Sequence, residues 1–267
     1  MWAGGSRQIQ MAELTALLER RLLRGEHLTL YGPRGSGKST VLTRLYARLQ
    51  RNGIPCAYSP ATVALDDITR ALERAYPTVN TLDVGRRTAR LRLWYAADRR
   101  CGVLLLDHFH CTGSAMVSCL RRLHGRIAGV LTAMDVEGEV ERCAMRPWRF
   151  GAMSVRMPLA TARQLGRLLD ERWRTARLPR LAENAAHAFV AAAHGRPGWI
   201  TQCIELACER RYWCAQGPLV TVLCIDTEAQ VRYRALAMVR AEPAAERGGE
   251  CVGQESSSAG GRRHRGG

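Results

Sequence analysis

The sequence predicts an α/β fold: a parallel five-stranded sheet with helices on both faces, followed by a smaller all-helical domain. Two observations lead to this prediction. Up to Pro158, short apolar runs alternate with amphipathic helical patterns, as in sheets that are buried on both faces. After Pro158 only helical patterns remain. With 267 residues and 46% hydrophobic content, the chain is long enough to bury a sizeable core.

The elements of the first part follow one another along the chain. A helix is expected over residues 8–24, where Ile9, Leu14 and Leu18 share one face. A strand over 27–31 leads into a glycine-rich turn, and the helix after that turn ends near Asn52 and Gly53. The remaining strands are expected over 54–59, 101–107, 128–134 and 153–157, and the remaining helices over 64–76, 84–98 and 115–124.

The second part is expected to hold four helices. The first opens at Thr161, and the others are expected over 181–193, 199–213 and 226–240, with a break at residues 195–198. From Glu242 onward the chain has little to bury, so we expect a disordered tail. The expected domains are therefore residues 1–158, 159–240 and 241–267.

The turn after the first strand carries the most specific motif. It reads Gly32-Pro33-Arg34-Gly35-Ser36-Gly37-Lys38-Ser39, followed by Thr40, and matches the phosphate-binding P-loop pattern G-x-x-x-x-G-K-[ST]. Lys38 is the only lysine among 40 basic residues, at the one position where a compact ammonium must reach the β- and γ-phosphates. The hydroxyl of Ser39 is expected to bind Mg²⁺. The alternative is an ordinary glycine-rich turn, but strand, loop and helix stand in the required order, so the sequence predicts a P-loop NTPase domain that binds ATP and Mg²⁺.

Asp107 is the second candidate for the metal. It ends the apolar run at 103–106 and so lies at the carboxyl end of a predicted strand, where ligands collect in open α/β sheets. We expect it to hold Mg²⁺ through water, as a Walker B carboxylate does. The alternative is an aspartate that merely ends a strand.

Bulk composition indicates a polyanionic partner. The formal charge is +16, and residues 241–267 hold four Arg and four Glu, so the excess lies in residues 1–240. DNA or RNA is the expected partner, with the arginine-rich helix at 84–98 as the best candidate surface. The alternatives are an arginine-rich proteome and, for this helix, a solvated face.

The sequence also argues against a membrane-spanning protein and against a protein held together by disulfides. No apolar stretch reaches 18 residues and no apolar signal core opens the chain, so we expect a cytoplasmic protein without a membrane span. The ten cysteines include no C-x-x-C pair, so we interpret them as buried thiols rather than disulfides. The grouping of Cys203, Cys208 and Cys214 with His187 and His194 matches no zinc pattern.

Together these motifs resemble the AAA+ ATPases over roughly residues 10–215. The most similar members are initiator-like: origin-recognition ATPases, secretion ATPases of the ExeA type and the ATPases that regulate DNA transposition. The resemblance rests on the P-loop, the Asp107 strand, a strand that ends in Leu131-Thr132, and Gly195-Arg196-Pro197 in the helical lid. It implies that Thr132 senses the γ-phosphate from the tip of the fourth strand and that Arg196 contacts phosphate from the lid. The alternatives are a satisfied strand threonine and an exposed lid arginine.

The resemblance also implies a homo-oligomer with an arginine finger given to the neighbouring subunit. Arg142, Arg146 and Arg149 are all candidates for that finger. Many family members carry Glu directly after the Walker B Asp, where this chain has His108. Either His108 or His110 substitutes for it, or hydrolysis is slow and ATP acts mainly as a switch. The sequence favours slow turnover.

The function predicted from the sequence is an ATP-dependent switch that associates with DNA and recruits or loads a partner protein whose identity the sequence does not reveal. One alternative is an ATP-binding protein-interaction scaffold without nucleic-acid binding. A second is a small-molecule kinase, which the long helical part after the sheet disfavours.

Overall fold

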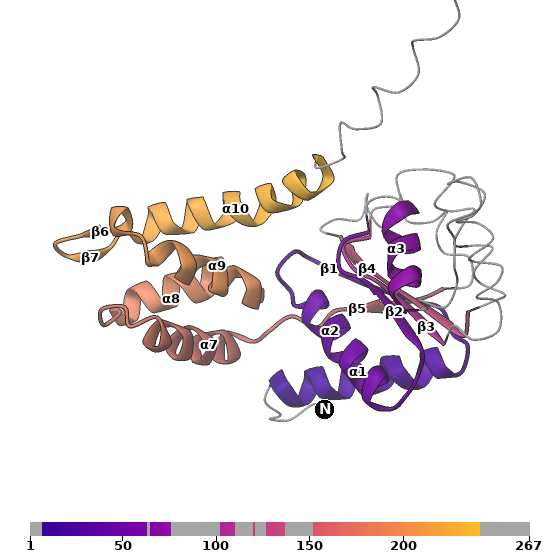
Figure 1. The fold of residues 1–267 in the computed structure, drawn as a ribbon. Coiled ribbons are helices and arrows are strands. Elements are labelled where there is room, and N and C mark those ends of the chain that lie inside the picture. Colours follow the sequence, from indigo (N-terminus) through magenta and orange to yellow (C-terminus); the bar gives the residue numbers. More distant parts are fainter. Residues whose placement is uncertain are drawn as a thin grey trace, which may run out of the picture.

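The computed structural model describes residues 7–62, 65–75, 102–109, 120, 127–136 and 152–240. The helix predicted over 84–98, most of the one over 115–124 and the tail from residue 241 lie outside these residues. Within them, the predicted α/β class and its five-stranded parallel sheet are confirmed (Figure 1).

The sheet has the strand order β2-β3-β4-β1-β5, and every neighbouring pair is parallel. Its strands are β1 (Leu28–Gly32), β2 (Cys56–Ser59), β3 (Val103–Leu106), β4 (Gly129–Asp135) and β5 (Met153–Arg156). Since parallel strands end at the same edge of a sheet, the residues after β1, β3 and β4 meet there, and this edge is where ligands bind in open α/β sheets.

Helices cover both faces because the strand side chains alternate and both sets are apolar. Val103 and Leu105 of β3 belong to a core shared with α1 (Arg7–Leu23) and α2 (Lys38–Arg51). Leu104 and Leu106 belong to a second core, which includes residues of α3 (Leu65–Ala75). Figure 1 shows α3 on the opposite side of the sheet from α1 and α2.

One glycine permits the closest contact between a helix and the sheet. A Cβ atom built on Gly129, at the start of β4, would lie 2.8 Å from the carbonyl oxygen of Leu22 in α1. That separation is below any normal contact distance. The position therefore requires glycine if α1 is to pack against β4.

The C-terminal helices form a third core of their own. They are α7 (Ala162–Thr175), α8 (Glu183–Ala192), α9 (Pro197–Ala207) and α10 (Val220–Arg240). The largest fully buried side chains of this core are Trp199, Phe189 and Tyr212, of which Tyr212 lies between α9 and α10. Helix α7 starts where the sequence predicts, because Thr161 and Gln164 form a reciprocal capping box. In Figure 1 these helices lie to one side of the sheet.

The helix predicted over 199–213 ends earlier than expected, and a different structure follows it before α10. Helix α9 ends at Ala207, and a 3-10 turn, η2 (Arg210–Tyr212), leads into a short antiparallel hairpin of β6 (Trp213–Cys214) and β7 (Gly217–Pro218). Gly217, the first residue of β7, has φ 128°, a backbone conformation that favours glycine. Helix α10 then begins six residues before the predicted start at residue 226. No helix among the described residues is both long and apolar enough to cross a membrane.

Candidate nucleotide-binding site

The glycine-rich turn adopts the backbone that an anion-binding loop requires. Gly35 and Gly37 have φ values of 74° and 102°, which residues with a Cβ atom rarely adopt. Helix α2 begins at Lys38, directly after the turn. The unpaired N–H groups and the positive dipole end of α2 are therefore directed at the loop, which makes it a site for phosphate.

Lys38 lies in this loop with its amine already coordinated by oxygen atoms. Its Nζ donates to the carbonyl oxygens of Gly32 at 2.8 Å and Pro33 at 2.9 Å. It also forms an ion pair with Oδ1 of Asp135 at 2.7 Å, and its side chain is only 7% exposed. The single lysine of the chain is thus held in the loop by two carbonyl oxygens and one carboxylate.

Asp107 follows β3 as the sequence predicts and is 2% exposed. Its two carboxylate oxygens accept hydrogen bonds, Oδ1 from the backbone N–H of His108 at 2.9 Å and Oδ2 from the hydroxyl of Tyr58 at 3.4 Å. Oγ of Ser39 lies 3.4 Å from Nε2 of His108. Asp107 and Ser39 offer oxygen ligands, which Mg²⁺ prefers, and a bound Mg²⁺ would neutralise phosphate charge there.

Asp135 is the site residue that the sequence reasoning missed. It ends β4, pairs in register with Gly32, and forms ion pairs with both Lys38 and Nε of Arg34, the latter at 3.2 Å. The signal that could have revealed it is the one used for Asp107: an aspartate that ends a buried apolar run, here Val130–Met134. Two acidic residues from neighbouring strands therefore lie at the P-loop edge.

The charges of this cluster shift two pKa values. Burial alone would raise the pKa of Asp135, but contact with His108 and the charge of Lys38 outweigh burial and hold it well below its ordinary value. Contact with the Asp135 carboxylate raises the pKa of His108 above its ordinary value, although burial opposes this. Asp135 is therefore an anion at neutral pH.

These residues line a cavity of about 900 Å³ between the sheet and the C-terminal helices. The P-loop contributes its backbone, Lys38, Ser39 and Thr40, and His108 and Asp135 lie on the same wall. Met11 of α1, Arg44 of α2 and Leu168 of α7 also line it. The volume is within the range of small-molecule pockets, so the cavity can hold a nucleotide as well as its phosphates.

The predicted position of Thr132 at the tip of its strand is wrong. Strand β4 extends three residues further, to Asp135, so Thr132 lies in mid-strand opposite Thr29. It is fully buried, its Oγ1 lies 3.1 Å from Oγ1 of Thr29, and it does not line the cavity. The polar group that the structure places at the tip of the fourth strand is Asp135.

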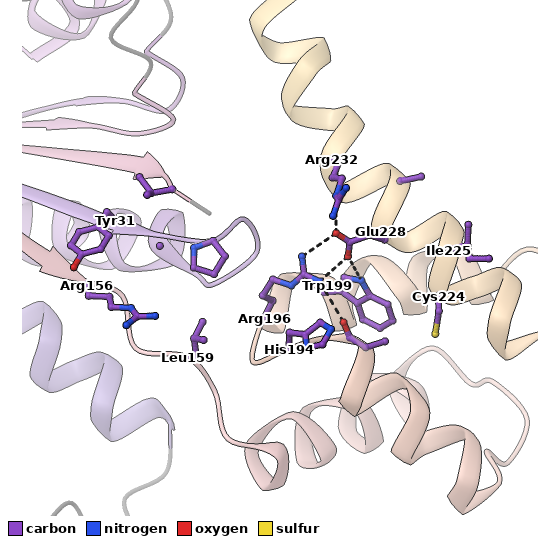
Figure 2. A pocket seen from close by; sticks show the side chains of 15 residues that line it. Tyr31, Arg156, Leu159, His194, Arg196, Trp199, Cys224, Ile225, Glu228 and Arg232 are labelled. Carbon is purple, nitrogen blue, oxygen red and sulfur yellow. Dashed lines mark hydrogen bonds and ion pairs between the residues drawn. The ribbon is translucent and has the colours of Figure 1, made fainter. Parts of the chain in front are cut away.

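Arg196 precedes α9 as predicted, but it contacts the lid rather than the P-loop cavity. Nη2 and Nη1 of Arg196 lie 2.7 Å and 3.4 Å from the two carboxylate oxygens of Glu228 in α10. Glu228 also accepts from Nε1 of Trp199 at 3.2 Å and Nε of Arg232 at 3.0 Å (Figure 2). The Arg196 hydrogen bonds lower the pKa of Glu228, although burial opposes them. This cluster lines a separate cavity of about 1020 Å³ on the other side of the loop.

Two hydrogen bonds join the P-loop to the C-terminal helices α7–α10, which are called the lid here. The backbone N–H of Gly198 in α9 donates to the carbonyl of Gly35 at 2.8 Å, and Nη1 of Arg34 donates to the carbonyl of Arg232 in α10 at 2.8 Å. A Cβ atom on Gly198 would lie 2.8 Å from Cα of Gly35, so this approach requires glycine. These two hydrogen bonds join the P-loop to α9 and α10.

Other predicted residues are only partly described. Arg142, Arg146, Arg149, His110 and the basic helix at 84–98 lie outside the described residues. Among the thiols expected to be buried, Cys56 and Cys203 are buried and Cys224 is half-buried, while Cys208 and Cys214 are exposed. Within the described ranges, no three His, Cys, Asp or Glu side chains are grouped so that they could hold a metal ion.

A comparison with protein families identified one match. The model of the AAA ATPase domain family matches residues 6–227 of this chain. A search of curated proteins found no match.

Solved structures of similar fold include a Cdc6p and an Orc1 protein. Cdc6p from Pyrobaculum aerophilum is 19% identical with a TM-score of 0.50, and the match covers 74% of this chain and 60% of that one. The Orc1 protein of Aeropyrum pernix, solved in complex with DNA, is 20% identical with a TM-score of 0.52, covering 84% and 65%. The chain thus spans about three fifths of the length of these proteins, and at this identity the likeness concerns the fold.

Proposed function

The chain belongs to the AAA ATPase family, and from that premise we propose that it is an ATP-dependent switch protein that associates with DNA. The observation that supports ATP binding most directly is the cluster at the P-loop edge. A buried ammonium, a helix N-terminus and two carboxylates from neighbouring strands converge there, beside a cavity large enough for a nucleotide.

The first experiment tests nucleotide binding. Replacing Lys38 by alanine removes the only ammonium that can reach the β- and γ-phosphates, so binding of a fluorescent ATP analogue should fall at least about 100-fold, on the scale of a lost charge-assisted contact. Arg51→Gln is the matched control, because it removes one positive charge from the other, exposed end of α2. Micromolar affinity retained by the Lys38→Ala variant would contradict the proposed site.

We propose that the lid reports the γ-phosphate through Arg196. In the structure, the guanidinium of Arg196 forms an ion pair with the carboxylate of Glu228. A phosphate group is also a bidentate partner for arginine and can compete with the carboxylate of Glu228 for Arg196 if the lid rotates. The two contacts between the lid and the P-loop would transmit that rotation, which is a hinge-type change with different contacts in each state.

Slow or partner-stimulated hydrolysis is the second element of the proposal. His108 occupies the position that directly follows the Walker B aspartate. The chain therefore lacks the glutamate that many family members carry there. A homo-oligomer in which Arg142, Arg146 or Arg149 reaches the neighbouring site would supply further charge stabilisation. Light scattering with and without a non-hydrolysable ATP analogue tests the assembly, and a monomer under both conditions would contradict it.

DNA association rests on charge and on one relative. The chain carries a formal charge of +16, and the structurally similar Orc1 protein was solved in complex with DNA. Contacts from arginines to phosphates would give binding that depends on salt and reads little sequence. ATP binding without retention on DNA at low salt would favour the alternative, a protein-interaction scaffold.

A cytoplasmic location remains a prediction from the sequence.

A further inference from the structure

The sheet has an exposed edge at β5. Among the described residues β5 pairs only with β1, and three of its four residues are exposed while Val155 is half-buried. Strand β2, at the other edge, is buried apart from the half-buried Tyr58. An uncovered edge strand is a template for pairing with another chain, which is why proteins usually cover or disrupt such edges.

The backbone groups of β5 point alternately toward β1 and away from it. The N–H groups of Met153 and Met157 donate to carbonyl oxygens of the segment that contains β1, both at 2.8 Å. Since alternate residues of a strand bond to the same neighbour, the N–H and C=O groups of Ser154 and Arg156 point away from β1. In the described part of the chain, no strand lies there to receive them.

An apolar surface continues from this edge. The chain that leaves β5 reaches Leu159, which with Arg156 lines the cavity of about 1020 Å³, called the second cavity here. Ile225 of α10 also lines it; Leu159 is 41% exposed and Ile225 is 63% exposed. In Figure 2, Arg156 and Leu159 lie on the sheet side of this cavity and Ile225 lies on α10. Exposed apolar side chains that line one hollow offer a place for the apolar groups of a partner.

The second cavity also carries excess positive charge. The charged residues that line it are Arg156, Arg196, Arg232 and Glu228, so three positive charges against one negative charge leave a formal charge of +2. Glu228 pairs with Arg196 at 2.7 Å and with Arg232 at 3.0 Å, whereas Arg156 forms no ion pair with a described residue. A segment that carries negative charge therefore complements this surface.

We propose that β5 and the second cavity bind an extended acidic segment of a partner protein. The segment adds to the sheet beside β5, where its backbone bonds to the outward groups of Ser154 and Arg156. Its apolar side chains pack against Leu159 and Ile225, and its carboxylates lie near Arg156 and Arg232.

A protein segment fits this surface better than a nucleic acid does. The arginines would attract phosphates as well, but a nucleic acid has no peptide backbone to pair with a strand edge and no aliphatic side chains to cover Leu159 and Ile225. The inference goes beyond the proposed ATP-binding function and does not depend on it, because Ser154, Arg156 and Ile225 do not line the nucleotide cavity.

The first test uses a library of random peptides displayed on phage and selected against the full chain. A length of about 12 residues allows a strand of typical length and a segment that enters the cavity. The enriched peptides should carry net negative charge, with apolar residues at alternate positions that face one side of the added strand. A library from which no acidic peptides are enriched would overturn the inference.

A fluorescent synthetic copy of one enriched peptide is then titrated with variants of the chain. Arg156→Glu reverses a charge, Ile225→Asp places a charge against apolar side chains, and Ser154→Pro removes an outward N–H. Each should weaken binding at least about tenfold in fluorescence anisotropy. Val222→Asp is the matched control, because Val222 is 44% exposed on the same helix as Ile225 but does not line the cavity. It should change the affinity less than about twofold.

Circular dichroism establishes that each variant is folded. If Ser154→Pro is not, Ile225→Asp still decides, because that side chain is largely exposed and its replacement does not disturb the core. Equal effects of Ile225→Asp and Val222→Asp would overturn the inference.

Hydrogen exchange tests the strand pairing directly. The amides of Ser154 and Arg156 should exchange at least about tenfold more slowly when the synthetic peptide is bound, because they gain hydrogen-bond partners. Unchanged exchange at both amides would overturn strand addition. A short DNA duplex should not displace the peptide; displacement would assign this surface to nucleic acid and would likewise overturn the inference.

Discussion

Replacing Glu228 by glutamine should make ATP bind more tightly while making the nucleotide-free protein less stable. The change keeps the shape of the side chain but removes the charge that holds Arg196, whose Nη2 and Nη1 lie 2.7 Å and 3.4 Å from the carboxylate. Hydrogen bonds to charged groups contribute about 1.5–3 kcal/mol. Because the Glu228 side chain is 30% exposed, solvent weakens the pair and the lower figure of about 1.5 kcal/mol applies.

A free energy of about 1.5 kcal/mol corresponds to about a tenfold change in an equilibrium constant. If Arg196 must leave Glu228 to reach the γ-phosphate, the variant no longer has to break this pair, and its Kd for ATP should fall about tenfold. The Kd for ADP should not change, because ADP lacks the γ-phosphate. The melting temperature without nucleotide should fall by about 3–6 °C, since each kcal/mol is worth a few degrees in a chain of this size.

Fluorescence titrations with ATP and ADP analogues and thermal melts measure these quantities. Arg232→Gln is the control: Arg232 also pairs with Glu228, but its side chain is 68% exposed and its backbone carbonyl still binds Arg34. It should leave both nucleotide affinities unchanged. A lower melting temperature for Glu228→Gln with unchanged or weaker ATP binding would refute the role of Arg196 as a phosphate sensor.

Two further predictions concern DNA and the fold. Raising the salt concentration from about 50 to 200 mM should weaken DNA binding about 1000-fold if six phosphates are contacted, as measured by fluorescence anisotropy; a flat response would exclude phosphate contacts. Gly129→Ala should cost about 1–3 kcal/mol of unfolding free energy, because its Cβ would overlap the carbonyl of Leu22. Gly166→Ala in α7 is the control, because nothing lies within 4 Å of the added Cβ atom. It should raise the unfolding free energy by about 0.5–1 kcal/mol in denaturant titrations. Equal effects at both glycines would contradict the packing described for β4.

Local patterns were enough to predict the sheet and one half of the site. The P-loop is a contiguous motif between a strand and a helix, and Asp107 ends an apolar run, so both could be recognised without knowing any long-range contact. The capping box at Thr161 and Gln164 likewise set the start of α7. Features of this kind depend on neighbours within about four residues, which the sequence displays directly.

Long-range contacts account for what the sequence analysis missed. Thr132 was assigned by its polarity, but its hydroxyl is satisfied by Thr29, which is distant in sequence and adjacent only in the sheet. The ion pair between Arg196 and Glu228 joins residues 32 positions apart on different helices. Nothing in either local pattern specifies which of the many charged residues will meet, so the pairing of Arg196 with Glu228 became visible only in three dimensions.

The solitary ε-amine of the chain has one practical consequence. A protease that cleaves after lysine has a single bond to attack in these 267 residues, and that bond lies at the first turn of α2. Since the Lys38 side chain is 7% exposed and bound to Asp135, cutting requires the loop to open first. The rate at which two fragments of about 38 and 229 residues appear on a gel would therefore report the local unfolding of this loop.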